Sequence, residues 1–269
     1  MNKAPVFFLS HGAPDFALEP GIPGAHLRSI GQRLPELEAL IVVSAHWQTR
    51  NIHVMTTPAP DTIHDFRGFD PALYDIHYPA PGHPEAARSA AKLLRDAGFT
   101  VHEDARRGLD HGAWVPLLHL RPDVDIPVIQ VSLPVDADTR TALRMGQALA
   151  PLRRQGMAIV GSGSLTHNLY EALGHMPQAP EHAEAFGQWV RATLTSGNIE
   201  ALVTYRQHAP AAERNHPTEE HFLPLLVAAG ATEADEPITT IEGEMRYGVL
   251  LMESYAWGLA AEDEQATPL

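Results

Sequence analysis

Short apolar runs alternate along most of the chain with longer segments in which apolar residues recur at helical spacing. In runs such as Ile41-Val42-Val43, consecutive residues are apolar without alternation. Runs of this kind are typical of strands that are covered on both faces. The pattern predicts strands at residues 5–10, 39–45, 52–57, 126–133, 155–161, 238–242 and 247–255, and helices at residues 84–97, 138–151, 180–195 and 218–229.

Strands that alternate with helices indicate a mainly parallel sheet with helices on both faces. We therefore predict an α/β fold in which residues 1–269 form a single catalytic domain, a three-layer α/β/α arrangement around a central, mostly parallel (mixed) sheet. Little helix separates the last two strands, which are expected to join the sheet in antiparallel fashion. Residues 58–84 form a long loop bearing Pro, Gly and His, and such loops in compact domains are often functional.

The composition limits the classes of chemistry and of partner. Of the 269 residues, 44% are hydrophobic and 19% are charged, with a formal net charge of −14 and no cysteine. Without cysteine, disulfides, thiolate metal sites and a cysteine nucleophile are excluded. The acidic balance argues against a nucleic-acid partner, because binding that backbone requires clustered Lys and Arg. No apolar stretch is long enough to span a membrane or to serve as a signal peptide, so a cytoplasmic protein is expected.

Histidine is unusually frequent, with 16 copies, and three of them share one context. His11 and His46 directly follow predicted strands, and His167 follows one after five residues, most of them small. In open α/β sheets, ligands bind beyond the carboxyl ends of the strands. Each of these histidines taken singly is compatible with a hydrogen-bonded loop position, but the shared context favours convergence on a metal ion.

Two further segments carry candidate histidines. His221 is expected at the third position of a helix capped by Thr218, whereas His216 is expected to be a solvent-exposed loop residue. His111 follows Asp110, and the alternative for this segment is a turn stabilised by the aspartate. A contiguous H-E-x-x-H motif, a Walker loop and a G-x-S-x-G nucleophile elbow are all absent from the sequence.

An ordered set of segments resembles the class III extradiol ring-cleavage dioxygenases, in the branch similar to DOPA-4,5-dioxygenase. The segments are S-H-G-A-P at 10–14, V-S-A-H-W at 43–47, T-I-H-D-F at 62–66, Y-P-A-P-G at 78–82, D-H-G at 110–112, T-H-N-L at 166–169 and E-H-F-L-P-L at 220–225. Because the matches keep their order along nearly the whole chain, the set is highly specific.

The resemblance implies a role for each histidine. His11, His46 and His221 correspond to the metal ligands, His167 to the catalytic histidine beside the metal and His111 to a second catalytic histidine of the pocket. It also implies an extradiol dioxygenase that uses Fe(II) and O2 to cleave a catechol-type ring, DOPA-like or a related substituted catechol, to a ring-opened semialdehyde. In the loop at 58–84, His64 and Tyr78 are expected to contact the substrate.

The third ligand departs from the usual pattern of non-haem iron oxygenases, which is two histidines and one carboxylate. Three neutral histidines also resemble a hydrolytic zinc site. Zinc in the purified protein and a zinc-dependent hydrolase on the same site therefore stay open, as does a non-catalytic metal-binding module of the same fold. The expected partners are a small aromatic diol and O2. The preferred catechol, the coordination of His167 to the metal and the oligomeric state, including a homo-oligomer, are left open.

Overall fold

The computed structural model describes residues 3–174 and 180–259. The strands are β1 (Val6–Ser10), β2 (Ala39–Thr49), β3 (Ile52–Met55), β4 (Val101–Asp104), β5 (Val128–Pro134), β6 (Met157–Gly163), β7 (Ile238–Ile241), β8 (Met245–Arg246), β9 (Leu250–Leu251) and β10 (Ser254–Trp257). The α-helices are α1 (Gly21–Gln32), α2 (Pro84–Asp96), α3 (His111–Leu120), α4 (Thr139–Leu149), α5 (Leu169–Ala172), α6 (Pro180–Thr195), α7 (Ile199–Val203), α8 (Tyr205–His208), α9 (Ala212–Asn215) and α10 (Leu223–Gly230). Short 3-10 helices occur at Pro14–Ala17, Pro71–Asp75 and Ala150–Gln155.

One mixed sheet organises the described part of the chain, with the strand order β4-β3-β5-β2-β6-β1-β10-β7. Its centre, β5-β2-β6-β1, is parallel. At one side β10 pairs antiparallel with β1, and β7 pairs antiparallel with β10. At the other side β3 pairs antiparallel with β5. The predicted mostly parallel, mixed sheet and its antiparallel late strands are therefore confirmed.

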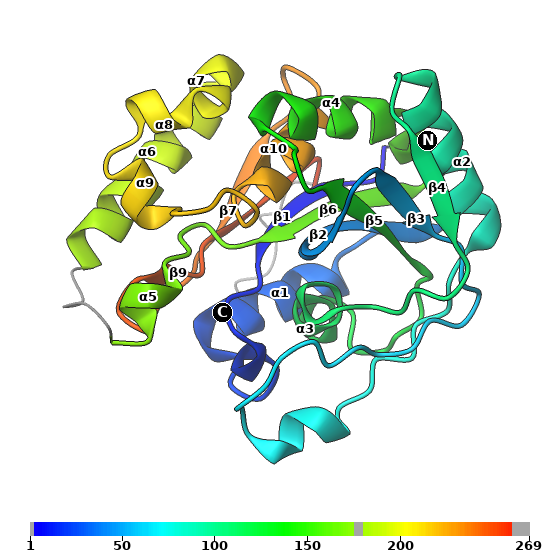
Figure 1. Ribbon diagram of the computed structural model, residues 1–269, viewed down its shortest axis with the longest axis horizontal. Helices are drawn as coiled ribbons and strands as arrows, with labels where there is room; N and C mark the ends of the chain where they lie inside the picture. Colours follow the sequence, from blue (N-terminus) through cyan, green and yellow to red (C-terminus); the bar gives the residue numbers. More distant parts are fainter. Residues whose placement is uncertain (1–2, 175–179, 260–269) are drawn as a thin grey trace, which may run out of the picture.

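Both faces of the sheet are buried. Val6 and Phe8 of β1 pack on one face in a core that includes residues of α2, α4, α6 and α10. The alternate residues Phe7 and Leu9 pack on the opposite face in a core that includes residues of α1 and α3. Figure 1 shows the sheet between these two helical layers. Since successive side chains of a strand point to opposite faces, an unbroken apolar run supplies both cores at once.

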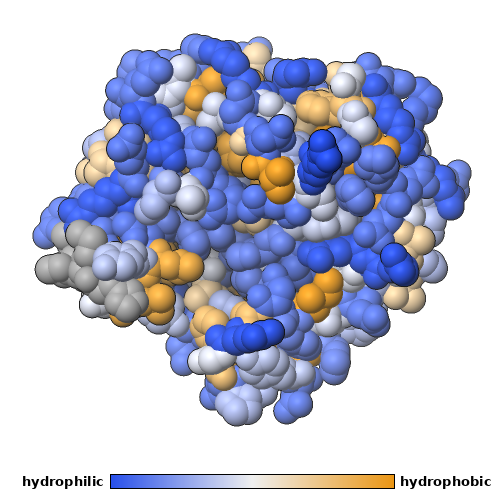
Figure 2. All heavy atoms as spheres, in the orientation of Figure 1, coloured by the Kyte–Doolittle hydropathy of each residue, from blue (hydrophilic) through white to orange (hydrophobic). Residues whose placement is uncertain are grey.

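The surface is largely polar. On the face drawn in Figure 2, hydrophilic residues predominate and the hydrophobic ones lie in small scattered groups. No helix among residues 3–174 and 180–259 is long and apolar enough to cross a membrane.

Several elements differ from the sequence prediction, which contains no counterpart of β4, β8, α5, α7, α8 and α9. The strand predicted at 247–255 is in fact two strands, β9 and β10, and its first residues are not extended: Tyr247 and Gly248 both have positive φ, of 49° and 67°, and lie in the turn between β8 and β9. The helices α1 and α3 were not predicted. Every described position of α3 except Leu118 is buried, so the helix has no polar stripe by which a helical period is recognised.

The predicted helix at 218–229 is also wrong at its start. The helix α10 begins at Leu223 and carries Pro224 in its first turn, where a missing N–H does no harm. A helix that began at Thr218 would need the backbone N–H of residue 224 to donate to the carbonyl of Glu220, and Pro224 has no N–H. Instead, Thr218 donates its hydroxyl proton to the Glu220 carboxylate, and residues 218–222 form a turn.

Two glycines of β6 allow α10 to approach the sheet. A Cβ atom added at Gly161 would lie 2.0 Å from the carbonyl oxygen of Pro224, and one at Gly163 would lie 2.1 Å from the carbonyl oxygen of His221. Both obstacles are backbone atoms, which cannot move aside without displacing the helix or the turn. The distance between β6 and the turn that carries His221 therefore depends on these glycines.

We predict that Gly161→Ala lowers the free energy of unfolding by at least about 1–3 kcal/mol, the usual cost of overpacking. Urea unfolding followed by circular dichroism measures this change. Gly197→Ala is the control, because its Cβ would meet nothing within 4 Å, although its φ of 67° disfavours alanine. A smaller loss in Gly161→Ala than in Gly197→Ala would contradict this account of the packing.

Candidate metal centre

Three histidines converge at the carboxyl ends of the central strands. His11 directly follows β1, and His46 lies inside β2, which extends four residues beyond the predicted end at 45. The pairing of β2 with β5 shifts register between Val43 and Gln48, so His46 occupies an irregular stretch of the strand. His221 lies in the turn before α10 and not at the third position of a helix.

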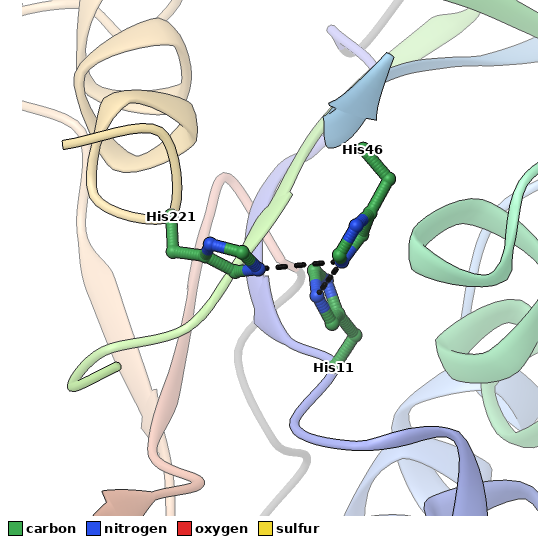
Figure 3. Close-up of side chains that lie close together, drawn as sticks. All are labelled: His11, His46 and His221. Atoms are coloured by element: carbon green, nitrogen blue, oxygen red, sulfur yellow. Dashed lines mark hydrogen bonds between the residues drawn. The ribbon is translucent and has the colours of Figure 1, made fainter. Parts of the chain in front are cut away.

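The Nε2 atoms of these three rings face one another (Figure 3). Nε2 of His46 lies 3.0 Å from Nε2 of His11 and 3.3 Å from Nε2 of His221. Two imidazole nitrogens that share one ion at about 2.1 Å, with angles between octahedral and tetrahedral values, are about 3.0–3.4 Å apart. The spacing therefore fits a single ion bound by His11, His46 and His221.

Burial keeps these rings neutral. Desolvation is the largest cause that lowers the pKa of His11 and of His221 well below the ordinary value, and neighbouring histidines lower both further. Desolvation and His111 lower the pKa of His46 to about 3. The Glu220 carboxylate accepts a hydrogen bond of 3.0 Å from Nδ1 of His221, so Nε2 of that neutral ring carries a lone pair. A neutral ring with a free lone pair is the form in which histidine binds a metal.

His111 lies beside the three rings, at the first position of α3. Its ring centroid is 3.9 Å from that of His46 and 5.6 Å from that of His11. Asp65 accepts hydrogen bonds of 2.9 Å from both the backbone N–H and Nδ1 of His111. Burial alone would raise the pKa of Asp65, but these hydrogen bonds outweigh it and lower the pKa to about 2. The carboxylate therefore fixes the His111 ring with Nε2 free.

His167 lies against the third ligand. Its ring stacks on that of His221 with centroids 3.4 Å apart and an interplanar angle of 12°. Burial, followed by repulsion from His46 and His111, lowers the pKa of His167 to about 3. The five histidines that the sequence singled out for the centre are thus brought together by the fold.

His216 contradicts the expectation of a solvent-exposed loop residue. It is fully buried and packs against the rings of Phe186 and Phe222. Its Nε2 donates to the carbonyl of Leu165 at 2.9 Å. The prediction of exposure is wrong because tertiary packing places the ring against Phe186 of α6 and Phe222 of the turn before α10.

The two predicted substrate contacts in the loop at 58–84 have backbone partners. His64 donates from Nε2 to the carbonyl of Ile76 at 3.0 Å. Tyr78 is buried and donates its hydroxyl proton to the carbonyl of Arg121, which caps the C-terminal end of α3. That end is about 15 Å from His111 by the helical rise. The structure does not bring Tyr78 to the histidine cluster.

Sequence reasoning missed the carboxylates that flank the centre. Asp65 and Glu220 each lie with two histidines in a group whose potential ligand atoms are within 4.8 Å of one another. Asp65 and Glu220 lie within the segments at 62–66 and 220–225 that carry the family resemblance, but no role was predicted for either residue. Only the contact with a histidine nitrogen identifies them.

Comparisons with known proteins agree with this geometry. Residues 7–254 match the family model described as the catalytic LigB subunit of aromatic ring-opening dioxygenase. The 4,5-DOPA dioxygenase extradiol of Escherichia coli K12 is 40% identical over 261 residues, which is 96% of each chain. The protein of the same name from Beta vulgaris is 40% identical over 94% of this chain and 96% of its own. A crystal structure of an uncharacterised Escherichia coli K12 protein matches with a TM-score of 0.78 and 35% identity, covering 94% of this chain and 99% of that one.

We predict that His221→Ala abolishes stoichiometric metal binding, because it removes one of three converging nitrogens. His216→Ala is the matched control: it lies five residues away, is equally buried and does not share the centre. Elemental analysis of the purified variants measures the bound metal. The assignment fails when His216→Ala loses the metal and His221→Ala retains it.

A second prediction concerns stability in acid. Burial lowers the pKa of His216 from 6.5 to about 3. Between these values the unfolded chain binds a proton that the folded chain does not, so stability is lost as the pH falls below 6.5. His216→Phe should therefore make the metal-free protein less sensitive to acid. Urea midpoints at about pH 7.5 and about pH 5 measure the difference. An equal fall in both proteins would assign the sensitivity to other groups.

Proposed function

Because the chain belongs to the LigB family of aromatic ring-opening dioxygenases, we propose that it cleaves a catechol-type ring with O2 at the three-histidine centre. The observation that carries the proposal is the convergence of three neutral Nε2 nitrogens with a further histidine stacked beside them. The family match over residues 7–254 supports the prediction of one catalytic domain.

We propose Fe(II) as the working metal, held by His11, His46 and His221. When bound there, Fe(II) supplies the redox chemistry that allows O2 to react with a catecholate. Three ligands leave open positions for a substrate. The same three neutral histidines would also hold zinc, which has no redox chemistry of its own.

His167 is placed to accept a catechol proton. A catechol binds a metal most strongly after losing protons, and a neutral imidazole is a suitable acceptor near neutral pH. Burial keeps His167 neutral, and its stacking on His221 holds it beside the ligand set. Because burial lowers its pKa to about 3, His167 can hold the proton released by the substrate hydroxyl only while the negative catecholate lies beside it.

His111 lies against a different ligand, His46, with ring centroids 3.9 Å apart. With Nδ1 donating to Asp65, the neutral ring offers Nε2 as an acceptor and donates from Nε2 only after protonation. His111 is therefore suited to take up a proton and return it to an oxygen that gains negative charge.

The substrate class follows from the relatives. Proteins from Escherichia coli and Beta vulgaris that are named for 4,5-DOPA share 40% identity with this chain over nearly its whole length. We propose DOPA or a related substituted catechol, opened beside its two hydroxyls to a semialdehyde. His64 is retained as a substrate contact in this proposal, because its ring lies among aromatic side chains next to Phe66, which touches His111. Tyr78 is not.

The test is anaerobic reconstitution with Fe(II), followed by exposure to O2 and a panel of catechols that includes DOPA. We expect O2 uptake to equal catechol consumption and a yellow semialdehyde to form. Hydrolysis of an ester or amide that persists with zinc and without O2 would replace this function with that of a zinc hydrolase. Metal binding without either reaction would indicate a binding module.

In the same assay, His167→Ala should keep its metal and lose at least about 10²-fold in turnover, the usual size of a general-base contribution. His102→Ala, which changes an exposed histidine on β4, is the control and should keep full activity. Metal loss in His167→Ala comparable to that in His11→Ala would make His167 a fourth ligand.

A further inference from the structure

A proline inside α3 leaves one carbonyl without its helical donor. In an α-helix the carbonyl of residue 112 accepts from the N–H of residue 116, which here is Pro116 and has no N–H. Gly112 is buried, and a buried carbonyl without a partner costs free energy. The Gly112 carbonyl therefore requires a donor from outside the helix.

Ser162 of β6 supplies that donor. The fully buried Ser162 hydroxyl donates its proton to the Gly112 carbonyl. Nδ1 of His11 lies 2.9 Å from the same Ser162 oxygen. A hydroxyl has a single proton, so the oxygen that donates to Gly112 acts toward His11 as an acceptor. Nδ1 of His11 consequently carries the proton, and Nε2 carries the lone pair that faces the centre.

The first turn of α3 is held firmly enough to fix this direction. Asp110 accepts from the Ser44 hydroxyl at 2.7 Å and from the Ala113 N–H at 3.2 Å, which ties the start of α3 to the middle of β2. A Cβ at Gly112 would lie 2.4 Å from the Ser44 hydroxyl oxygen, so only glycine fits at this approach. The Gly112 carbonyl thus has little freedom to turn away from Ser162.

We propose that Ser162 is a positioning residue for metal binding, which sets the tautomer of His11 because Pro116 leaves the Gly112 carbonyl as the acceptor of the serine proton. The inference rests on the metal centre of the proposed function but not on ring cleavage. It concerns any divalent ion that binds imidazole.

Without the serine hydroxyl, His11 would have no acceptor at Nδ1, and its proton would be free to move to Nε2. That tautomer cannot bind a metal until it is reversed. Loss of a group that orients a histidine ligand typically weakens metal binding by about 10–100-fold. We expect a change of this size in the dissociation constant of Ser162→Ala for Zn²⁺.

The experiment compares Ser162→Ala with Ser164→Ala in the full-length, metal-stripped protein. Ser164 is fully buried two residues further along, and its hydroxyl has no hydrogen-bond partner within residues 3–174 and 180–259. Zn²⁺ is titrated in competition with a chromophoric chelator, and circular dichroism checks that each apoprotein is folded. Ser164→Ala should bind Zn²⁺ as the wild type does.

A second readout separates positioning from packing. In protein labelled with ¹⁵N at histidine, NMR distinguishes the Nδ1–H and Nε2–H tautomers of His11 before Zn²⁺ is added. We expect the Nδ1–H form in the wild type and in Ser164→Ala, and a population of the Nε2–H form in Ser162→Ala.

Three outcomes would overturn the inference: wild-type Zn²⁺ affinity in Ser162→Ala, an equal loss in both serine variants, or an unchanged His11 tautomer in Ser162→Ala. Failure of the wild type itself to bind Zn²⁺ would instead overturn the metal centre of the proposed function.

Discussion

Three neutral, largely buried imidazoles have their Nε2 nitrogens 3.0 and 3.3 Å apart, close enough to share one cation or, without it, a proton on His46. Much of the fold is organised to maintain this approach. The parallel strands β1 and β2 deliver two of the rings to one edge of the sheet, and the turn before α10 delivers the third. Burial keeps the rings neutral, and a neutral ring has a nitrogen lone pair that can bind a metal ion. A bound ion would therefore stabilise the folded chain as well as its active site.

Two prolines decide how the helices meet the centre. Pro224 has no N–H to offer Glu220, so α10 begins late and leaves His221 on a turn. Pro116 has no N–H to offer Gly112, so a carbonyl at the start of α3 accepts from β6 instead. The two helices lie on opposite faces of the sheet. The ligand set is thus supported from both helical layers, by backbone groups that the prolines leave free.

In the proposed metal centre a histidine would stand where non-haem iron oxygenases commonly have a carboxylate ligand, so the ligand set would carry one less negative charge. The structure places two carboxylates behind histidine rings, where each accepts a hydrogen bond from an Nδ1 atom. Glu220 accepts from Nδ1 of His221, and Asp65 accepts from Nδ1 of His111. A carboxylate behind a histidine raises the basicity of the ring and fixes its tautomer. Negative charge therefore supports the centre without occupying a coordination position.

The apolar pattern alone predicted the sheet and its two covered faces, and it predicted that His11, His46 and His167 meet, because residues that follow parallel strands lie at one edge of the sheet. His111 and His221 were candidates from other segments, and the family resemblance implied their place in the centre. The sequence did not determine the start of α10, the burial of His216 or the isolation of Tyr78 from the centre. Those depend on which distant backbone and aromatic groups a side chain meets, as do the roles of Asp65 and Ser162. The direction of the hydrogen bond between His11 and Ser162 follows only from the assembled network, because the Ser162 proton can be assigned only when its acceptor, the Gly112 carbonyl, is known. The tertiary structure alone supplies that acceptor.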